Sequence, residues 1–106
     1  MKFGLNKTVI NKIREVLVVF PAVEEAIIYG SRAIGTFREG SDIDLTLIGD
    51  LSSQDLLQIQ VELDDKMLPY TFDISLYHQL SNLKLLEHIN RAGKSLYSKK
   101  ALEGKM

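Results

Sequence analysis

Apolar side chains recur at helical spacing in three stretches of the chain. Residues 6–20 place them on one face and place charged and amide side chains on the other, and a proline follows directly. Residues 52–67 repeat the pattern behind a Ser-x-x-Asp capping box, and residues 80–89 repeat it before Gly93. Because a period of about 3.6 residues buries one face of a helix, each stretch predicts an amphipathic helix, the last one capped by Gly93.

The stretches between these helices have the shorter period of strands. Residues 26–29 are an apolar run that ends at a glycine, whereas residues 42–48 and 70–76 alternate strictly between apolar and polar positions. Residues 95–97 suggest a further short strand near the C-terminus. Alternation with period two puts one face of a strand in the core and the other outside it. The pattern therefore predicts strands interleaved with the helices.

This succession indicates an α/β (α+β) unit with a small mixed sheet and helices packed on it. No internal repeat, low-complexity segment or linker divides the 106 residues. We expect a single domain over residues 1–100 and a frayed tail over residues 101–106, with Lys99 and Lys100 solvated where the tail begins. Strands joined through a helix usually lie parallel, so the two alternating strands are expected to be parallel neighbours.

Composition and charge narrow the possible partners. Thirteen Lys and Arg residues against fourteen Asp and Glu residues give a net charge of −1, so no basic field gathers nucleic acid or anionic membrane. The absence of cysteine excludes disulfides and thiolate chemistry. The N-terminal residues lack the apolar core of a signal peptide, and the longest apolar run is far below the roughly 18 residues of a membrane span. We therefore expect a cytoplasmic protein with no membrane association.

Three aspartates stand out because this residue type is depleted in strands. Asp42 and Asp44 lie on the same side of their strand, about 6 to 7 Å apart along it at the usual rise per residue. Asp73 lies on the polar side of the next strand, so parallel pairing brings it beside them. A solvated strand face explains one such residue but not three in phase. Converging carboxylates repel one another unless a divalent cation neutralises them, and such ligands suit Mg²⁺ or Mn²⁺.

The turn at Gly30 and Ser31 offers a place for phosphate. Glycine lets the backbone approach a ligand closely, and a short helix that starts at Ser31 would present free amides to an anion. Arg32 could add planar donors to phosphate oxygens, whereas Arg38 is expected to be a solvated loop charge. No Lys-Ser/Thr pair follows Gly35, which excludes a P-loop.

Other residues with chemical potential have simpler interpretations. His78 and His88 have no matching acidic or cysteine ligands at metal-binding spacing, so we expect both to be ordinary surface or capping residues. Tyr70 and Phe72 share the phase of the apolar residues of their strand. We therefore expect them to pack in the core rather than to stack on a nucleotide base.

The combined motif resembles the signature of the nucleotidyltransferase superfamily that includes DNA polymerase beta. It consists of Gly30-Ser31, ten further residues, the run Asp42-Ile43-Asp44-Leu45 and an aspartate on a later strand. The resemblance is closest to the minimal nucleotidyltransferases, the MNT proteins, and covers roughly residues 5–100. It implies the polymerase beta palm-like nucleotidyltransferase fold. The residues that it implies are Gly30, Ser31 and Arg32 for the nucleotide, and Asp42, Asp44 and Asp73 for catalysis and for the metal.

The resemblance also implies an activity and a partner. MNT proteins commonly pair, as antitoxins, with a helical HEPN toxin, and well-described members transfer AMP from ATP to a tyrosine of that toxin. The chain is thus expected to be a metal-dependent adenylylating nucleotidyltransferase, with Mg²⁺ or Mn²⁺ as cofactor, ATP as substrate and a HEPN protein as partner in a hetero-oligomer. The alternative is a non-catalytic module that binds a nucleotide or the partner and neutralises that partner by contact alone. Three aspartates favour the enzyme, since a pure binder has no evident need for them.

Overall fold

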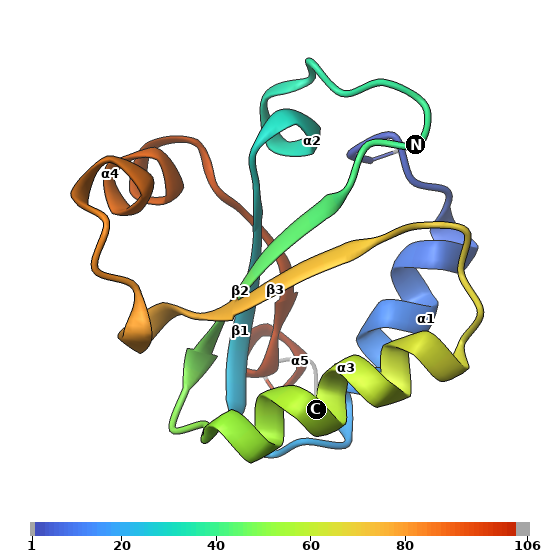
Figure 1. Ribbon diagram of the computed structural model, residues 1–106. Helices are drawn as coiled ribbons and strands as arrows, with labels where there is room; N and C mark the ends of the chain where they lie inside the picture. The colour runs from blue at the N-terminus through green and yellow to red at the C-terminus, as the bar shows by residue number, and fades with distance from the viewer. Residues whose placement is uncertain (1, 104–106) are drawn as a thin grey trace.

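The computed structural model describes residues 2–103 of the chain. Helices and strands are interleaved along it, as the sequence predicts (Figure 1). The elements in chain order are α1 (Lys7–Val18), β1 (Val23–Tyr29), α2 (Ser31–Ile34), β2 (Ile43–Gly49), α3 (Ser53–Asp65), β3 (Phe72–Leu76), the 3₁₀ turn η1 (Tyr77–Gln79), α4 (Leu83–Ala92), β4 (Lys94–Ser98) and α5 (Lys99–Glu103). No helix in this part of the chain is long and apolar enough to cross a membrane.

The four strands form one mixed sheet in the order β3-β2-β1-β4. β1 pairs antiparallel with β2 and with β4. β2 pairs parallel with β3, to which it is connected through α3. This confirms the mixed α+β fold and the parallel pairing of the two alternating strands. Parallel pairing matters for the site because it aligns residues that lie far apart in sequence at one level of the sheet.

Local side chains set the helix starts that the sequence predicts. At the start of α1 the amide of Val9 donates to Oδ1 of Asn6 at 2.8 Å. The predicted capping box is present at α3, where the Asp55 amide donates to Ser52 Oγ at 3.1 Å and the Ser52 amide donates to Asp55 Oδ2 at 2.9 Å. Each cap pairs an amide that the first helical turn leaves without a carbonyl partner.

Two helices have ends that differ from those of their hydrophobic patterns. α3 ends before Met67, which is exposed and has left-handed backbone with φ +54°. α4 starts directly after Asn82, whose side chain caps it, rather than at residue 80. Gly93 caps the other end of α4 as predicted, because its amide donates to the carbonyl of Ile89 at 2.8 Å. The hydrophobic period therefore located both helices but not their ends.

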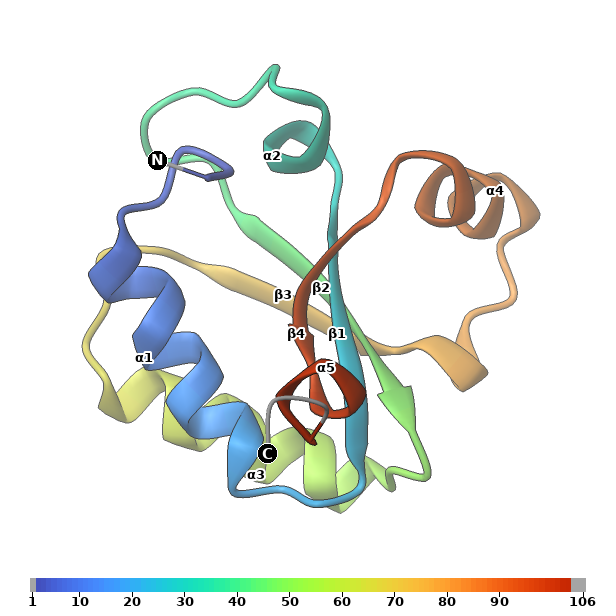
Figure 2. The same ribbon diagram turned by 180° about the vertical axis from the view of Figure 1, so that it is seen from behind.

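The core lies between the sheet and the pair of helices α1 and α3. These two helices lie side by side, and α4 stands on the other side of the strands (Figures 1 and 2). Ile28, Leu45 and Leu47 are fully buried in this core. Tyr70 and Phe72 are partly buried against it, which confirms their expected packing. With the apolar sides of β2 and β3 turned to the core, their polar sides face away from α1 and α3.

The structure describes only residues 101–103 of the predicted tail, where the backbone is helical, and the frayed tail itself stays a prediction. Lys99–Glu103 form the short helix α5, while residues 104–106 lie outside the described part of the chain. The Ala101 amide donates to Ser98 Oγ at 3.3 Å, and Lys99 Nζ donates to the carbonyl of Pro21 at 3.0 Å. A helix this short carries too few residues for a hydrophobic period, so only its contacts reveal it.

Candidate active site

The structure brings Asp44 and Asp73 together on neighbouring strands. The two residues are direct partners in the parallel register of β2 and β3. Asp42 precedes β2, which begins at Ile43, and its carboxylate is close enough to act electrostatically on Asp44. Asp44 is half-buried, whereas Asp42 and Asp73 are exposed. Asp44 and Asp73 thus meet at one end of the parallel pair, with Asp42 near enough for its charge to act on Asp44.

Asp44 is the carboxyl that this arrangement perturbs. Burial raises its pKa above the ordinary aspartate value, and the negative charges of Asp73 and Asp42 raise the pKa further. His88 has the opposite, smaller effect. A bound cation stabilises a carboxylate that is held among like charges, because it offsets the repulsion and compensates for the lost hydration. The electrostatics of the cluster therefore favour a bound cation.

The Gly-Ser turn, formed by Gly30 and Ser31, lies directly beside this cluster. Tyr29, the residue before the turn, is the cross-strand partner of Asp44. Gly30 has φ +74° and ψ −153°, a backbone conformation that is accessible essentially to glycine alone. A Cβ at this position would lie 2.5 Å from Oδ2 of Asp44. Glycine is thus required here by its backbone angles and by the closeness of the aspartate.

The helix α2 begins at Ser31 and is only one turn long. Its first intrahelical bond runs from the Ala33 amide to the Gly30 carbonyl at 3.1 Å, so the amides of Ser31 and Arg32 precede the helical ladder. Gly35, with φ +86°, ends the turn. Ser31 therefore places an amide outside the helical ladder directly after Gly30, which lies against Asp44. This is an arrangement suited to a phosphate held by donors on one side and by a cation on the other.

The side chain of Arg32 has a different place from the one expected. It is buried, and its Nε and Nη2 donate to the Ser41 carbonyl at 3.1 and 2.8 Å. Its Nη1 donates to the Phe3 carbonyl at 2.9 Å, and the guanidinium lies over the rings of Phe37 and Tyr70. Each of its three nitrogens thus donates to a protein carbonyl. Arg32 ties the N-terminal segment to the loop before β2, so our proposal for the site leaves its side chain out.

A layer of hydroxyl groups lies on the same face of the sheet as the aspartates. Ser75 Oγ donates to Thr46 Oγ1 at 3.0 Å, and Thr46 is fully buried. Burial raises the pKa of the Tyr29 hydroxyl, the hydrogen bond with Ser75 opposes this, and the charges of Asp73 and Asp44 add to it. These groups are neutral, so they add no charge to that of the carboxylates on this face.

His88 is the residue of this site that sequence reasoning missed. Its Nε2 accepts the Gly30 amide at 2.9 Å, and its ring meets the ring of Tyr29 edge to face. No motif signals this role, because His88 and Gly30 are 58 residues apart. His78 fits the expectation better, since it is exposed and its Nε2 lies 3.0 Å from the Leu51 carbonyl.

The donor set at the cluster fits a magnesium ion bound together with a nucleotide. Within residues 2–103, no three His, Cys, Asp or Glu side chains form a group that could hold a metal ion by themselves. Magnesium in nucleotide sites is commonly held by one or two carboxylates, with phosphate oxygens and water as its other ligands. The adjacent positions of Asp44 and Asp73, the repulsion that raises the pKa of Asp44, and the neighbouring Gly-Ser turn match that mode.

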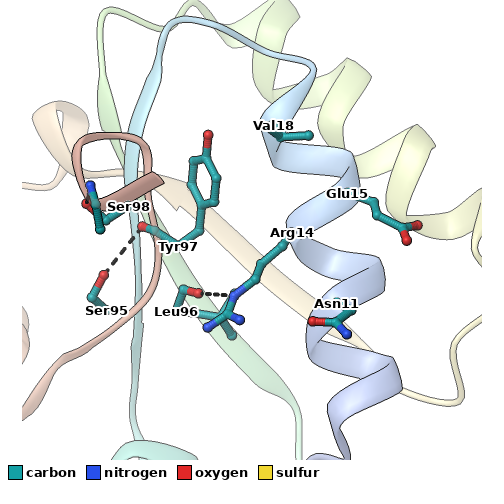
Figure 3. Close-up of a pocket in the computed structure, with 9 residues that line it drawn as sticks. Asn11, Arg14, Glu15, Val18, Ser95, Leu96, Tyr97 and Ser98 are labelled. Atoms are coloured by element: carbon teal, nitrogen blue, oxygen red, sulfur yellow. Dashed lines mark hydrogen bonds between the residues drawn. The ribbon is translucent and has the colours of Figure 1, made fainter. Parts of the chain in front are cut away.

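A hollow of about 560 Å³ lies elsewhere, between α1, β4 and α5 (Figure 3). Nε of Arg14 donates to the Leu96 carbonyl at 2.8 Å in it. Its lining residues are Asn11, Arg14, Glu15, Val18, Ser95, Leu96, Tyr97, Ser98 and Ala101. None of the predicted site residues lines it, so we place the candidate site at the carboxylates on chemical grounds rather than at this hollow.

Comparisons with known proteins agree with this fold. A family model described as polymerase beta, nucleotidyltransferase matches residues 11–102. A search of curated proteins gives no match. A toxin-antitoxin complex with AMP-PNP contains a chain of 22% identity and TM-score 0.69, with 87% of this chain and 75% of that chain covered.

Two further solved structures have the same fold. One is a MntA-HpeT toxin-antitoxin complex in which two aspartates, separated by one residue, are replaced by glutamate (21% identity, TM-score 0.70, 92% and 77% covered). The other is the tri-AMPylated HEPN toxin of Shewanella oneidensis in complex with its MNT antitoxin (17% identity, TM-score 0.66, 94% and 78% covered). Because the family model covers almost the whole described chain, including the Gly-Ser turn and the three aspartates, the chain belongs to the polymerase beta nucleotidyltransferase family.

Proposed function

We propose that this chain is an antitoxin that transfers AMP from ATP, with Mg²⁺ or Mn²⁺, to a tyrosine hydroxyl of a helical HEPN toxin. The observation that carries the proposal is the register of the sheet, which aligns Asp44 with Asp73 and sets both beside the Gly-Ser turn. Family membership supports nucleotidyl transfer. The choice of a protein acceptor draws on the AMPylated toxin of the Shewanella oneidensis complex.

In this proposal the chain's own residues hold the nucleotide and the metal. Asp42, Asp44 and Asp73 supply the carboxylates for the divalent cation, and Ser31 donates its amide and hydroxyl to the triphosphate. The cation, when bound, neutralises the carboxylates and the phosphate charge that builds up during transfer. The aspartate pair that was replaced by glutamate in one related complex has the spacing of Asp42 and Asp44, which supports their assignment.

The reaction moves one group between two oxygens. The tyrosine oxygen attacks the α-phosphorus of ATP, the bond from that phosphorus to the β-bridging oxygen breaks, and pyrophosphate leaves. The hydroxyl proton passes to a carboxylate of the site. Holding the hydroxyl in line with the leaving group supplies much of the rate, and this chain has only a small surface on which to build an acceptor pocket. The partner therefore presents its own tyrosine.

The charge of the chain fits a protein acceptor better than a nucleic acid. Its net charge is −1, and long nucleic acids are gathered by basic surfaces. The nucleotide itself needs only local contacts, which the Gly-Ser turn and the metal provide. A protein partner supplies its own binding energy through the interface.

The test is label transfer within the complex. The chain is mixed with the product of the adjacent gene, Mg²⁺ and ATP labelled at the α-phosphate. We expect label on a tyrosine of the partner, loss of label when EDTA is present, and loss of label with Asp44→Asn. Asp50→Asn is the matched control, since Asp50 is an exposed aspartate just beyond the other end of β2 and its replacement removes the same charge.

Two outcomes would contradict the proposal. A stable complex without label under Mg²⁺ or Mn²⁺ would leave a module that neutralises its partner by contact alone. Equal labelling by the parent and Asp44→Asn would place the chemistry outside the carboxylate cluster.

A further inference from the structure

The Gly-Ser turn is anchored from outside by a single histidine. His88, on α4, accepts the Gly30 amide through Nε2 at 2.9 Å. A backbone amide only donates, so this nitrogen carries the lone pair and the ring proton sits on Nδ1. The half-buried ring also meets Tyr29 edge to face, with centroids 6.1 Å apart and planes at 75°. His88 therefore contacts both residues that precede Ser31.

The hydrogen bond from Gly30 to His88 restricts a turn whose backbone is otherwise flexible. Gly30 has no Cβ to restrict its torsion angles, and its conformation of φ +74° and ψ −153° is one of several that glycine adopts easily. The two backbone polar groups of Gly30 are both held by the protein, because its amide donates to His88 and its carbonyl accepts the amides of Ala33 and Ile34 at 3.1 and 3.3 Å. The hydrogen bond with His88 thus selects one direction for the chain as it enters α2.

The anchor is effective because α4 is itself fixed to the sheet. Ile89 next to the histidine is buried. Tyr77 donates its hydroxyl to Oδ1 of Asn90 at 3.0 Å, and Gly93 is packed so closely that a Cβ there would lie 2.6 Å from Cγ2 of Ile27. These contacts lie on β1 and η1 rather than on α2. Through His88, α4 therefore fixes the position of the turn relative to the sheet.

We propose that His88 is a positioning residue for nucleotide binding, which holds the Gly-Ser turn against Asp44 by accepting the Gly30 amide. This inference rests on the proposed function. It has a further consequence for the role of Gly30. Since the Gly30 amide is already bonded to His88, the phosphate receives its hydrogen bonds from Ser31, and Gly30 contributes its backbone conformation and its lack of a side chain.

The first measurement uses the unaltered chain. A through-bond ¹⁵N–¹⁵N coupling between the Gly30 amide and Nε2 of His88 reports this hydrogen bond directly by NMR. We expect the coupling in the free chain and again after saturation with Mg²⁺ and ATP. Its absence in the free chain, or its loss when the nucleotide binds, would overturn the proposal even if every variant failed to fold.

The second measurement compares two substitutions of similar length. His88→Gln keeps an acceptor near the position of Nε2, while His88→Met fills similar space with only a weak acceptor. A typical hydrogen bond contributes about 0.5 to 1.5 kcal/mol, so we expect His88→Met to weaken binding of Mg²⁺ and ATP about two- to tenfold. His88→Gln should restore the affinity to within about twofold of the parent. His78→Met, at the other and exposed histidine, is the control and should bind like the parent.

Melting temperatures and amide exchange separate positioning from plain stability. A merely structural role would lower the melting temperature of His88→Met without changing the dissociation constant of the folded protein, and that result would overturn the proposal. Equal losses in the Gln and Met variants would overturn it too, because the acceptor would then be irrelevant. Faster exchange of the Gly30 amide in the Met variant alone is the supporting result. A parent chain that binds no Mg²⁺ and ATP, yet shows the coupling, would remove the proposed function, and with it this role in nucleotide binding.

Discussion

Replacing Gly30 by alanine tests the contact on which the geometry of the candidate site depends. The new Cβ would lie 2.5 Å from Oδ2 of Asp44 and 3.5 Å from its Cγ, and the residue would keep a positive φ of +74°. Backbone strain of this kind costs about 1 to 3 kcal/mol, and overpacking costs about 1 to 3 kcal/mol more. We expect Gly30→Ala to reduce the free energy of unfolding by about 2 to 6 kcal/mol, a large part of the stability of a small domain.

Gly35 supplies a control for the cost of a side chain at a positive φ. Gly35 has a similar φ of +86°, and a Cβ there would meet nothing within 4 Å. Gly35→Ala should therefore cost only the backbone strain, about 1 to 2 kcal/mol. The excess cost at Gly30 combines the contact with the aspartate and the greater strain of its backbone, because Gly30 has ψ −153° whereas Gly35 has ψ +11°.

A double-mutant cycle isolates that contact further. Asp44→Ala removes Oδ2 and Cγ, which leaves the Asp44 Cβ at 3.8 Å as the nearest atom of that residue. We expect Gly30→Ala to cost about 1 to 3 kcal/mol less in the Asp44→Ala background than in the parent. Urea unfolding in EDTA, followed by circular dichroism, gives all four free energies. A coupling below about 0.5 kcal/mol, or a Gly30→Ala cost no larger than that at Gly35, would show that the turn does not press on the aspartate.

Three further predictions concern single residues. Asp44→Asn should abolish nucleotide transfer yet leave the metal-free chain as stable as the parent or more stable. Because the pKa of Asp44 is raised in the fold, the parent loses stability as pH rises through that pKa. Melting in EDTA should therefore show a higher melting temperature for the variant, with a difference that grows upward from about pH 4, and a lower melting temperature of the variant would contradict this reasoning. Ser31→Ala should raise the dissociation constant for Mg²⁺ and ATP about tenfold or more, since a hydrogen bond to a charged group contributes about 1.5 to 3 kcal/mol; titration calorimetry checks this, and an unchanged constant would place the phosphate elsewhere. Arg32→Met should lower the free energy of unfolding by about 2 to 5 kcal/mol, because the carbonyls of Ser41 and Phe3 lose their donors. The folded variant should bind ATP as the parent does. A much weaker affinity for ATP without loss of stability would show that Arg32 contacts the nucleotide instead.

Short-range patterns in the sequence determined most of the secondary structure of this protein. The spacing of hydrophobic residues indicates only which face of an element is buried, and a capping box involves residues that are three apart. Both can therefore be identified without knowing the fold. The alternation around Asp42 and Asp44, with Asp73 in the same phase on a parallel strand, predicted the meeting of carboxylates that the register of β2 and β3 displays. The Gly-Ser turn was visible for the same reason, since it follows a strand and precedes a single helical turn.

Only the tertiary structure decided which side chains serve that turn and which support the fold. Arg32 follows Ser31 directly, yet its guanidinium is fixed by carbonyls of Phe3 and Ser41. His88 is 58 residues from Gly30, yet it accepts that residue's amide. Sequence adjacency does not fix the direction of a long side chain, and no local pattern records which distant helix will meet a turn. Both outcomes follow from the packing of whole elements, which sets the partner of each polar group only after the chain has folded.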